Sequence, residues 1–150
     1  MKIFGLDIET TGIDQSKGHR IIEIYIEGIE TTDFKEFSSL GKFHAMINPE
    51  RSIEKGAQEV HGISLFDLKG KPKWEDIAPR VQKILKVSDV AVAHNAAFDF
   101  PFIGGELLRV GLEIPHVNTF CTMENGRLAT AMGKSPTLAE LCWAMGIDYN

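Results

Sequence analysis

The chain has 150 residues and a formal net charge of −5, with 43% hydrophobic and 25% charged residues. This length fits one domain, and the composition excludes a disordered chain or a collagen-like repeat. The acidic balance argues against a passive nucleic-acid binder, which needs a basic face for phosphates, but it suits an enzyme that reaches phosphates through metal ions.

Five segments predict β-strands by their apolar or alternating side chains: residues 1–9, 21–29, 43–48, 90–94 and 117–121. The first strand enters a turn at Thr10-Thr11-Gly12, and Pro49 stops the third. Polar loops are expected at 13–20 and 31–42, the second as part of a hairpin. The continuous apolar run VAVAH at 90–94 indicates a strand buried on both faces of a parallel sheet.

Helices are predicted between and after these strands. Trp74, Ile77 and Val81 are spaced at helical intervals within 74–87. A capping box at 137–140 opens the last helix, and Gly146 stops it. The other helices are expected at about 53–60, 97–110 and 123–132. This order of strands and helices indicates an α/β layer arrangement with a mixed sheet.

Asp7 and Glu9 are two residues apart on the first strand, so their side chains share a face of the sheet. Phe4, Leu6 and Ile8 point to the other face and anchor the strand in the core. Two neighbouring carboxylates repel each other and are costly to bury without a cation or a proton. The alternative is an edge strand with two solvated acids.

Asp99 is the third candidate acid, because it follows the strand at 90–94 where functional groups of α/β sheets gather. The alternative is a simple acid in the first turn of a helix, where the helix dipole favours an anion. Phe98 beside it is a candidate for stacking on a base, or for packing against Phe102. The Thr10-Thr11-Gly12 turn offers hydroxyls, amides and close approach to a ligand, or is a turn selected only for its geometry.

Three carboxylates without a cluster of histidines or cysteines suit hard divalent cations bound through oxygen. Mg²⁺ or Mn²⁺ fits such a donor set better than zinc does. Two such ions would serve an in-line phosphoryl displacement. The sequence therefore predicts a metal site formed by Asp7, Glu9 and Asp99.

Two motifs carry a resemblance to a known family. DIETTG at 7–12 and HNAAFDFPFI at 94–103 resemble the first two motifs of the DEDD exonuclease superfamily, and IIEI at 21–24 and VHGIS at 60–64 are also similar. The likeness is to DnaQ-like, DEDDh-type proofreading 3′-5′ exonucleases, the epsilon-type subunits and their phage relatives. It implies a ribonuclease H-like fold, with a mixed five-stranded sheet flanked by helices, and hydrolysis from a 3′ end with two metal ions.

The resemblance also implies roles for individual residues. Asp7 matches the metal-bridging aspartate, Glu9 the glutamate ligand on the nucleophile side, and Asp99 the aspartate of the second motif. The residues that match positions around the terminal nucleotide are Thr10, Thr11, Gly12, His61, Asn95 and Phe98. For His61, the alternative is a histidine at a helix C-terminus beside Gly62.

The third motif of the family, H-x-A-x-x-D, does not occur in this sequence. It supplies the general-base histidine and a fourth carboxylate, and it normally follows a segment like TLAELCWAMGI at 137–147. We therefore expect residues 1–150 to be a single exonuclease domain truncated at its C-terminal end, with natural loss of the motif as the alternative. We also expect the chain to bind divalent metal weakly and to cleave slowly or not at all.

Three functions compete. The first is a 3′-5′ exonuclease acting on a single-stranded DNA end or a frayed primer terminus, in proofreading with a DNA polymerase partner. The second is an RNA-trimming exonuclease with the same site, since no residue that would select against the 2′-hydroxyl can be identified. The third is a non-catalytic nucleic-acid-binding or adaptor domain of the same fold.

Targeting and redox features of the sequence are few. No apolar run approaches the roughly 20 residues that cross a bilayer, and two acids near the start argue against a secretory signal. Cys121 and Cys142 lack the CxxC spacing. We therefore expect no membrane partner and a reducing, cytoplasmic compartment.

Overall fold

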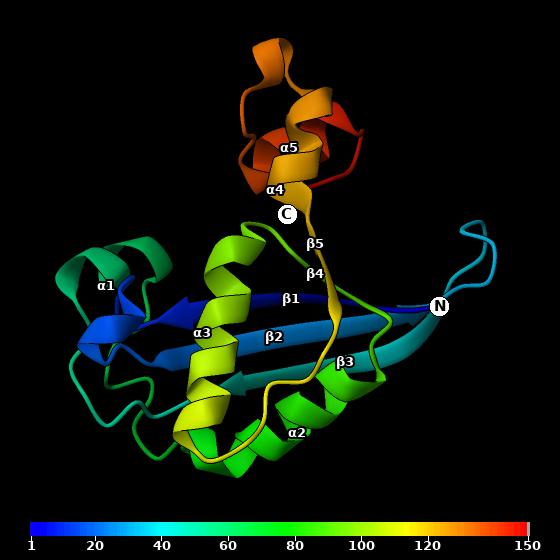
Figure 1. Ribbon diagram of the computed structural model, residues 1–150. Helices are drawn as coiled ribbons and strands as arrows, with labels where there is room; N and C mark the ends of the chain where they lie inside the picture. Colours follow the sequence, from blue (N-terminus) through cyan, green and yellow to red (C-terminus); the bar gives the residue numbers. More distant parts are fainter. Residues whose placement is uncertain (150) are drawn as a thin grey trace.

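The computed structural model describes residues 1–149, and its centre is a five-stranded mixed sheet in the order β3-β2-β1-β4-β5 (Figure 1). The strands are β1 Lys2–Thr10, β2 Ile21–Glu30, β3 Ser38–Met46, β4 Val90–Ala93 and β5 Asn118–Cys121. The first three strands run antiparallel, whereas β4 is parallel to β1 and β5 is parallel to β4. The predicted α/β class with a mixed five-stranded sheet is confirmed.

The helices lie close to their predicted positions. They are α1 Lys55–His61, α2 Trp74–Val87, α3 Ala96–Arg109, α4 Thr122–Asn125 and α5 Leu138–Ala144, with short 3₁₀ turns η1 Gln15–Lys17, η2 Gly126–Ala129 and η3 Ala131–Gly133. α2 has the bounds that its spacing predicted. The Thr137–Glu140 capping box is formed at the start of α5, since Thr137 Oγ1 accepts a hydrogen bond from the Glu140 amide.

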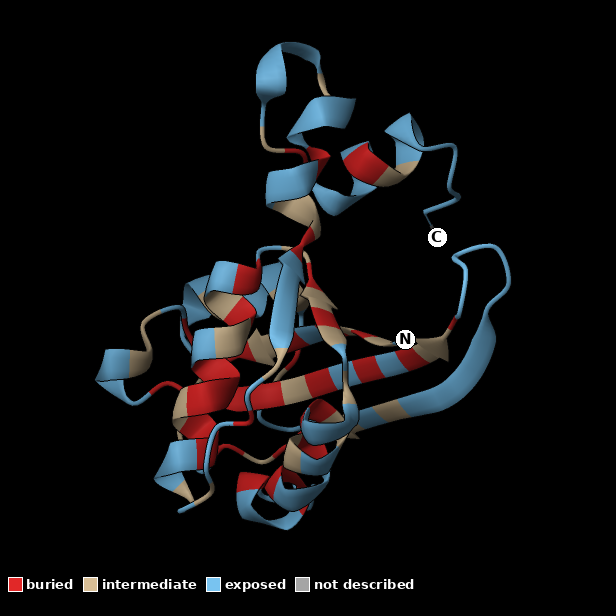
Figure 2. Ribbon diagram, turned by 45° about the vertical axis from the view of Figure 1, so that its right-hand side comes forward, coloured by how far each residue is buried: buried red, intermediate tan, exposed pale blue. Residues whose placement is uncertain are grey.

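The main core lies between one face of the sheet and helices α2 and α3, which cover that face (Figures 1 and 2). Its buried side chains come from the sheet and from both helices, among them Leu6, Ile24, Val81, Phe102 and Leu107. A smaller cluster joins Ile22 of β2 to Ile63 and Leu68 in the segment after α1. The helical stripes predicted from the sequence therefore face the sheet as expected.

Strand β4 is less buried than the sequence predicted. Ala91 and Ala93 are buried, but Val90 and Val92 are only half-buried, so the strand is not buried on both faces. Ala91 and Ala93 face the core under α2 and α3. The opposite face is not fully covered by residues 1–149. The small side chains of this strand therefore let helices pack closely against one face of β4, while its other face is only partly covered.

Two further boundaries differ from the predictions. β3 begins at Ser38, inside the expected polar connection, because residues 38–42 pair with the end of β2 by their backbone while their side chains stay exposed. The predicted helix at 123–132 is broken into α4, η2 and η3. Gly126 lies at the first break, where it packs against Leu141, and Met132 has a φ of 59° at the last.

The segment from Thr122 onwards forms a small lobe beyond the end of β5 (Figures 1 and 2). Its surface carries fully exposed apolar side chains, including Leu128, Met132 and Trp143. Hydrogen bonds from His94 to Thr122 and Pro136 tie this lobe to the end of β4. None of the helices within residues 1–149 combines the length and the apolar character that a membrane crossing requires.

Candidate active site

Strand β1 places Asp7 and Glu9 together on one face of the sheet, as the alternation predicted. Leu6 and Ile8 are buried on the opposite face, whereas Asp7 is exposed and Glu9 is half-buried. β1 is the middle strand of the sheet rather than an edge strand. The alternative of two solvated acids on an edge is therefore wrong for this strand.

Asp99 reaches the same region from the first turn of α3. That helix follows β4, which is hydrogen-bonded in parallel to β1, so α3 begins near the end of β1 that carries the two acids. Asp99 is only 3% exposed, which makes it the most deeply buried of the three carboxyls. The fold thus gathers the three predicted acids, although they are separated by 90 residues of chain.

Burial and mutual repulsion raise the pKa values of all three carboxyls. Burial, and then the charges of Asp7 and Glu23, raises the pKa of Glu9 to about 7. Burial, and then the charge of Asp7, raises the pKa of Asp99 to about 7. Loss of solvent around Asp7 and the charge of Glu23 also raise the pKa of Asp7. The group therefore holds more protons at neutral pH than isolated carboxyls would.

The donor chemistry of this site fits a hard divalent cation. All three side chains offer carboxylate oxygen, and a cation would relieve the repulsion that raises their pKa values. As they stand, no three Asp, Glu, His or Cys side chains among residues 1–149 are close enough together to hold an ion. Binding would therefore require Asp7, Glu9 and Asp99 to turn toward a common point.

The turn after β1 is packed against a buried histidine. Thr11 Oγ1 lies 3.0 Å from His19 Nδ1, and His19 Nε2 lies 3.1 Å from Glu54 Oε1. A Cβ atom at Gly12 would come within 2.4 Å of the His19 ring. Gly12 is therefore required for this internal contact. The Thr10 hydroxyl donates to Gly12 O, so the hydroxyls of both threonines are used within the protein.

His61 lies at a helix C-terminus, as the alternative interpretation from the sequence had it, while its place in a nucleotide pocket stays a prediction. It is the last residue of α1, and Gly62 follows with a φ of 75°. Its Nδ1 accepts a hydrogen bond of 3.0 Å from the Ile63 amide. Its Nε2 is buried and has no hydrogen-bond partner in residues 1–149. Buried ring nitrogens are normally paired, so this atom is available to a ligand.

Asn95 and Phe98 lie at the start of α3. Asn95 is exposed and has a φ of 81°, a conformation that asparagine tolerates better than most residues. Phe98 is half-buried, and its ring centroid lies 5.4 Å from the ring centroid of Phe102. The predicted packing of the two phenylalanines is confirmed, and part of the Phe98 ring still faces solvent.

Sequence reasoning missed Glu23, which faces Glu9 across the β1–β2 ladder. The alternation in residues 21–29 indicated that Glu23 lies on a polar face. The register of the two strands, which contains a bulge beside Glu9, could not be obtained from that alternation.

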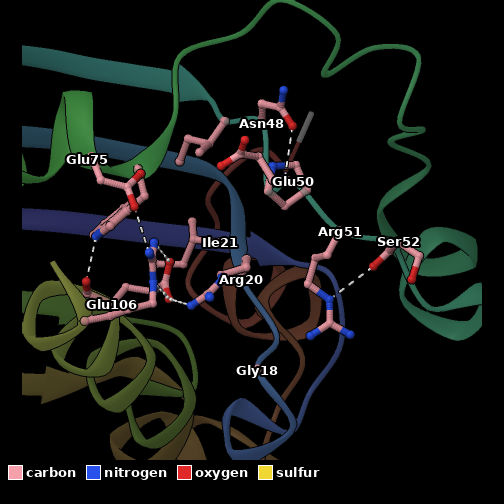
Figure 3. A pocket seen from close by; sticks show the side chains of 13 residues that line it. Gly18, Arg20, Ile21, Asn48, Glu50, Arg51, Ser52, Glu75 and Glu106 are labelled. Carbon is pink, nitrogen blue, oxygen red and sulfur yellow. Dashed lines mark hydrogen bonds and ion pairs between the residues drawn. The ribbon is translucent and has the colours of Figure 1, made fainter.

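A polar cavity of about 340 Å³ lies away from the three acids, between the start of β2 and the end of α3 (Figure 3). Within it the buried Glu106 carboxylate accepts hydrogen bonds from Arg20 and Arg109, and Arg109 also donates to Glu75. The Trp74 indole donates to the Glu106 carbonyl. These paired charges connect β2, α2 and α3, so the cavity belongs to the framework of the fold.

A sheet of this order, with acids gathered where β1 and β4 end, is the arrangement that the resemblance implied for a nuclease. The family model RNase_T, described as Exonuclease, matches residues 4–150. The chain belongs to this exonuclease family, whose members generally use divalent metal ions. The predicted relationship to DnaQ-like exonucleases is confirmed.

Curated relatives include two proteins named DNA polymerase III subunit epsilon. The chain is 42% identical to that of Buchnera aphidicola subsp. Acyrthosiphon pisum, covering 91% of this chain and 58% of the relative. It is 34% identical to that of Escherichia coli, covering 95% of this chain and 60% of the relative. The chain therefore spans about three fifths of these relatives' length.

Solved structures share the fold. Exonuclease X in complex with 5′ overhanging duplex DNA matches with a TM-score of 0.67 and 24% identity, covering 98% of this chain and 75% of that one. Escherichia coli Exonuclease I in complex with a dA16 oligonucleotide matches with a TM-score of 0.81 and 16% identity, covering 99% and 36%. The predicted ribonuclease H-like fold is confirmed.

Proposed function

We propose that this domain is a metal-dependent 3′-5′ exonuclease that hydrolyses phosphodiester bonds at the 3′ end of DNA. Its substrate would be a single-stranded end or a frayed primer terminus, and its role proofreading beside a DNA polymerase. The observation that carries the proposal is the convergence of Asp7, Glu9 and Asp99 with raised pKa values in a chain of the exonuclease family. The names of the epsilon relatives support DNA as the substrate and a polymerase as the partner.

The three carboxylates would hold two Mg²⁺ or Mn²⁺ ions, with Asp7 shared between them. When bound, such a pair activates a water and stabilises the leaving oxygen in phosphoryl transfer. Asp99 is held by the first turn of α3, and Glu9 by the middle strand of the sheet, so both ligands come from rigid elements.

The remaining predicted residues would position the terminal nucleotide. The backbone of Thr10–Gly12 and the side chain of Asn95 would line its sugar and phosphate, and the open part of the Phe98 ring would stack on its base. His61 would use its unpartnered Nε2 to contact the nucleotide. Residues 1–150 contain no H-x-A-x-x-D histidine, so we expect a rate lower by about 10²- to 10⁴-fold than with a general base.

The direct test uses 5′-labelled single-stranded DNA with the 150-residue chain in Mn²⁺. We expect slow shortening from the 3′ end that stops with EDTA and in Asp7→Ala. A chain that neither shortens DNA in Mn²⁺ nor binds Mn²⁺ in an Asp7-dependent way would contradict the proposal. A matched RNA oligonucleotide tests the second candidate, because an equal or faster RNA ladder would favour RNA trimming.

A non-catalytic nucleic-acid-binding or adaptor domain of the same fold is the third candidate. Such a domain would shift single-stranded DNA on a native gel equally well with EDTA and with Mn²⁺. The carboxylate site predicts the opposite, since three uncompensated acids repel phosphate until cations neutralise them. Metal-independent binding without any product would therefore select the adaptor.

A further inference from the structure

The sheet face that carries Asp7 and Glu9 continues across β2 and β3 as a polar surface. Asp7 pairs with Tyr25 of β2, and Tyr25 pairs with His44 of β3. Glu9 pairs with Glu23 of β2. Directly opposite side chains on antiparallel strands lie on the same face, with Cβ atoms about 5 Å apart. Glu23 is therefore a fourth carboxylate beside the candidate site.

Like charges directly opposite each other destabilise a sheet, so Glu23 needs a compensating contact. His44 provides it, since its Nε2–H donates a hydrogen bond of 2.7 Å to Glu23 Oε1. β3 lies on the side of β2 away from β1. The His44 contact thus holds the Glu23 carboxylate toward β3, while its strand keeps it beside Glu9.

The charge of Glu23 still acts on the acids of β1. It raises the pKa of Asp7 after the larger effect of desolvation, and that of Glu9 after desolvation and the charge of Asp7. Glu23 is 29% exposed and His44 is 51% exposed, so solvent screens the pair only in part. The negative charge of Glu23 therefore still reaches Asp7 and Glu9, although its carboxylate is hydrogen-bonded on the β3 side.

We propose that Glu23 is a positioning residue of the carboxylate site: held by His44, its negative charge attracts a divalent cation to Asp7 and Glu9 without coordinating it. This inference rests on the proposed metal-dependent function. It assigns part of the metal affinity to β2 and β3, to the IIEI segment at 21–24 and His44, which lie outside the two motifs that carry Asp7, Glu9 and Asp99. Glu23 acts through the field at the site, so its removal should alter cation binding while leaving the fold intact.

The test measures Mn²⁺ binding directly, from the electron paramagnetic resonance signal of free Mn²⁺ in low salt at about pH 8. Glu9 and Asp99 are then mostly ionised, so proton competition contributes little. We expect Glu23→Gln to raise the dissociation constant about three- to tenfold, as loss of one charge at this range implies. Its Tm should change little, because the substitution relieves the repulsion with Glu9 and at the same time weakens the contact with His44.

Two variants and a salt series separate the field from a structural effect. Glu27→Gln removes the same charge from the same face of β2, but four residues along the strand from Glu23 and opposite Gly5 instead of Glu9, and should change the constant less than about twofold. Glu23→Asp keeps the charge and should stay near wild type. The effect of Glu23→Gln should shrink at about 1 M KCl, where the Debye length is roughly 3 Å.

The outcomes are distinguishable. Wild-type chain that shows no saturable Mn²⁺ binding removable by Asp7→Ala overturns the proposed metal site, and the assignment of Glu23 with it. Wild-type binding with an unchanged constant in Glu23→Gln overturns the assignment alone. So does an equal change in Glu27→Gln, a change that persists in high salt, or a Glu23→Asp variant as weak as Glu23→Gln.

Discussion

Asp99 shows how the site is maintained at a cost to stability. It is almost fully buried beside two other acids, in the absence of any basic side chain hydrogen-bonded to it within residues 1–149. The helix dipole at the start of α3 offsets part of the cost. A buried carboxylate in this position is destabilised until a cation or a proton neutralises it.

This cost predicts a pH dependence. The pKa of Asp99 rises from 3.8 in the unfolded chain to about 7 in the folded one, so the folded state holds its proton more tightly between these values. The resulting stability is present below pH 3.8 and is lost as the pH rises through about 7. In EDTA, wild-type Tm should therefore fall over this range.

Asp99→Asn removes the titrating group, so in EDTA its Tm should fall less over the same pH range and exceed the wild-type Tm above neutrality. Thermal denaturation at a series of pH values measures both quantities. Mn²⁺ should raise the Tm of wild type more than that of Asp99→Asn. An identical fall of Tm with pH in the two proteins would show that ionisation of Asp99 does not destabilise the folded state.

At the scale of elements, α3 connects the site to the framework. Asp99 and Glu106 lie two turns apart on the buried side of this helix. Through Glu106, the far end of α3 is held to Arg20 before β2 and, through Arg109, to α2 (Figure 3). The C-terminal end of the helix is therefore fixed relative to the start of β2 and to α2.

Breaking this network should be costly. Glu106→Gln removes the buried charge that Arg20 and Arg109 share, so Arg20 loses its charged partner and Arg109 keeps only Glu75. Loss of hydrogen bonds to a charged group typically costs about 1.5–3 kcal/mol. Glu113→Gln is the control, because Glu113 forms an exposed pair with Lys86 that should contribute less than about 1 kcal/mol. Urea denaturation measures both. Equal, small losses of unfolding free energy in the two variants would show that Arg20 and Arg109 form other contacts when the Glu106 charge is removed.

The sequence predicted elements best where one side-chain pattern determines the structure. α2 has a strong apolar stripe and β1 a strict alternation, and both were located correctly, including the faces that hold Asp7 and Glu9. The start of β3 was missed because edge pairing uses backbone groups that any side chain permits. Glu23 could not be assigned because its role depends on strand register, and that depends on a bulge.

Residues 1–149 comprise a sheet with two covering helices and a C-terminal lobe that follows β5. Figure 2 shows buried residues concentrated in the sheet and in α2 and α3, whereas the lobe is mostly exposed. β5 leads into the lobe, and His94 fastens it through Thr122 and Pro136. A part with so little buried surface opens more readily than the core.

His94→Ala should therefore loosen the lobe selectively. We expect faster amide hydrogen exchange in α5, residues Leu138–Ala144, with protection in β1 and β2 unchanged. His116→Ala is the control, since His116 is an exposed histidine outside the lobe. Uniformly faster exchange in sheet and lobe would instead show that His94 stabilises the whole domain.

The two-sided character of β1 also bears on how this segment can evolve. Leu6 and Ile8 complete the core while Asp7 and Glu9, interleaved with them, form the site. Loss or gain of one residue here would turn the acids into the core and the isoleucine to solvent in a single event. Substitutions can be accepted one at a time along this strand. Changes of length cannot, so we expect homologous genes to keep β1 free of insertions and deletions even where the loops around it differ.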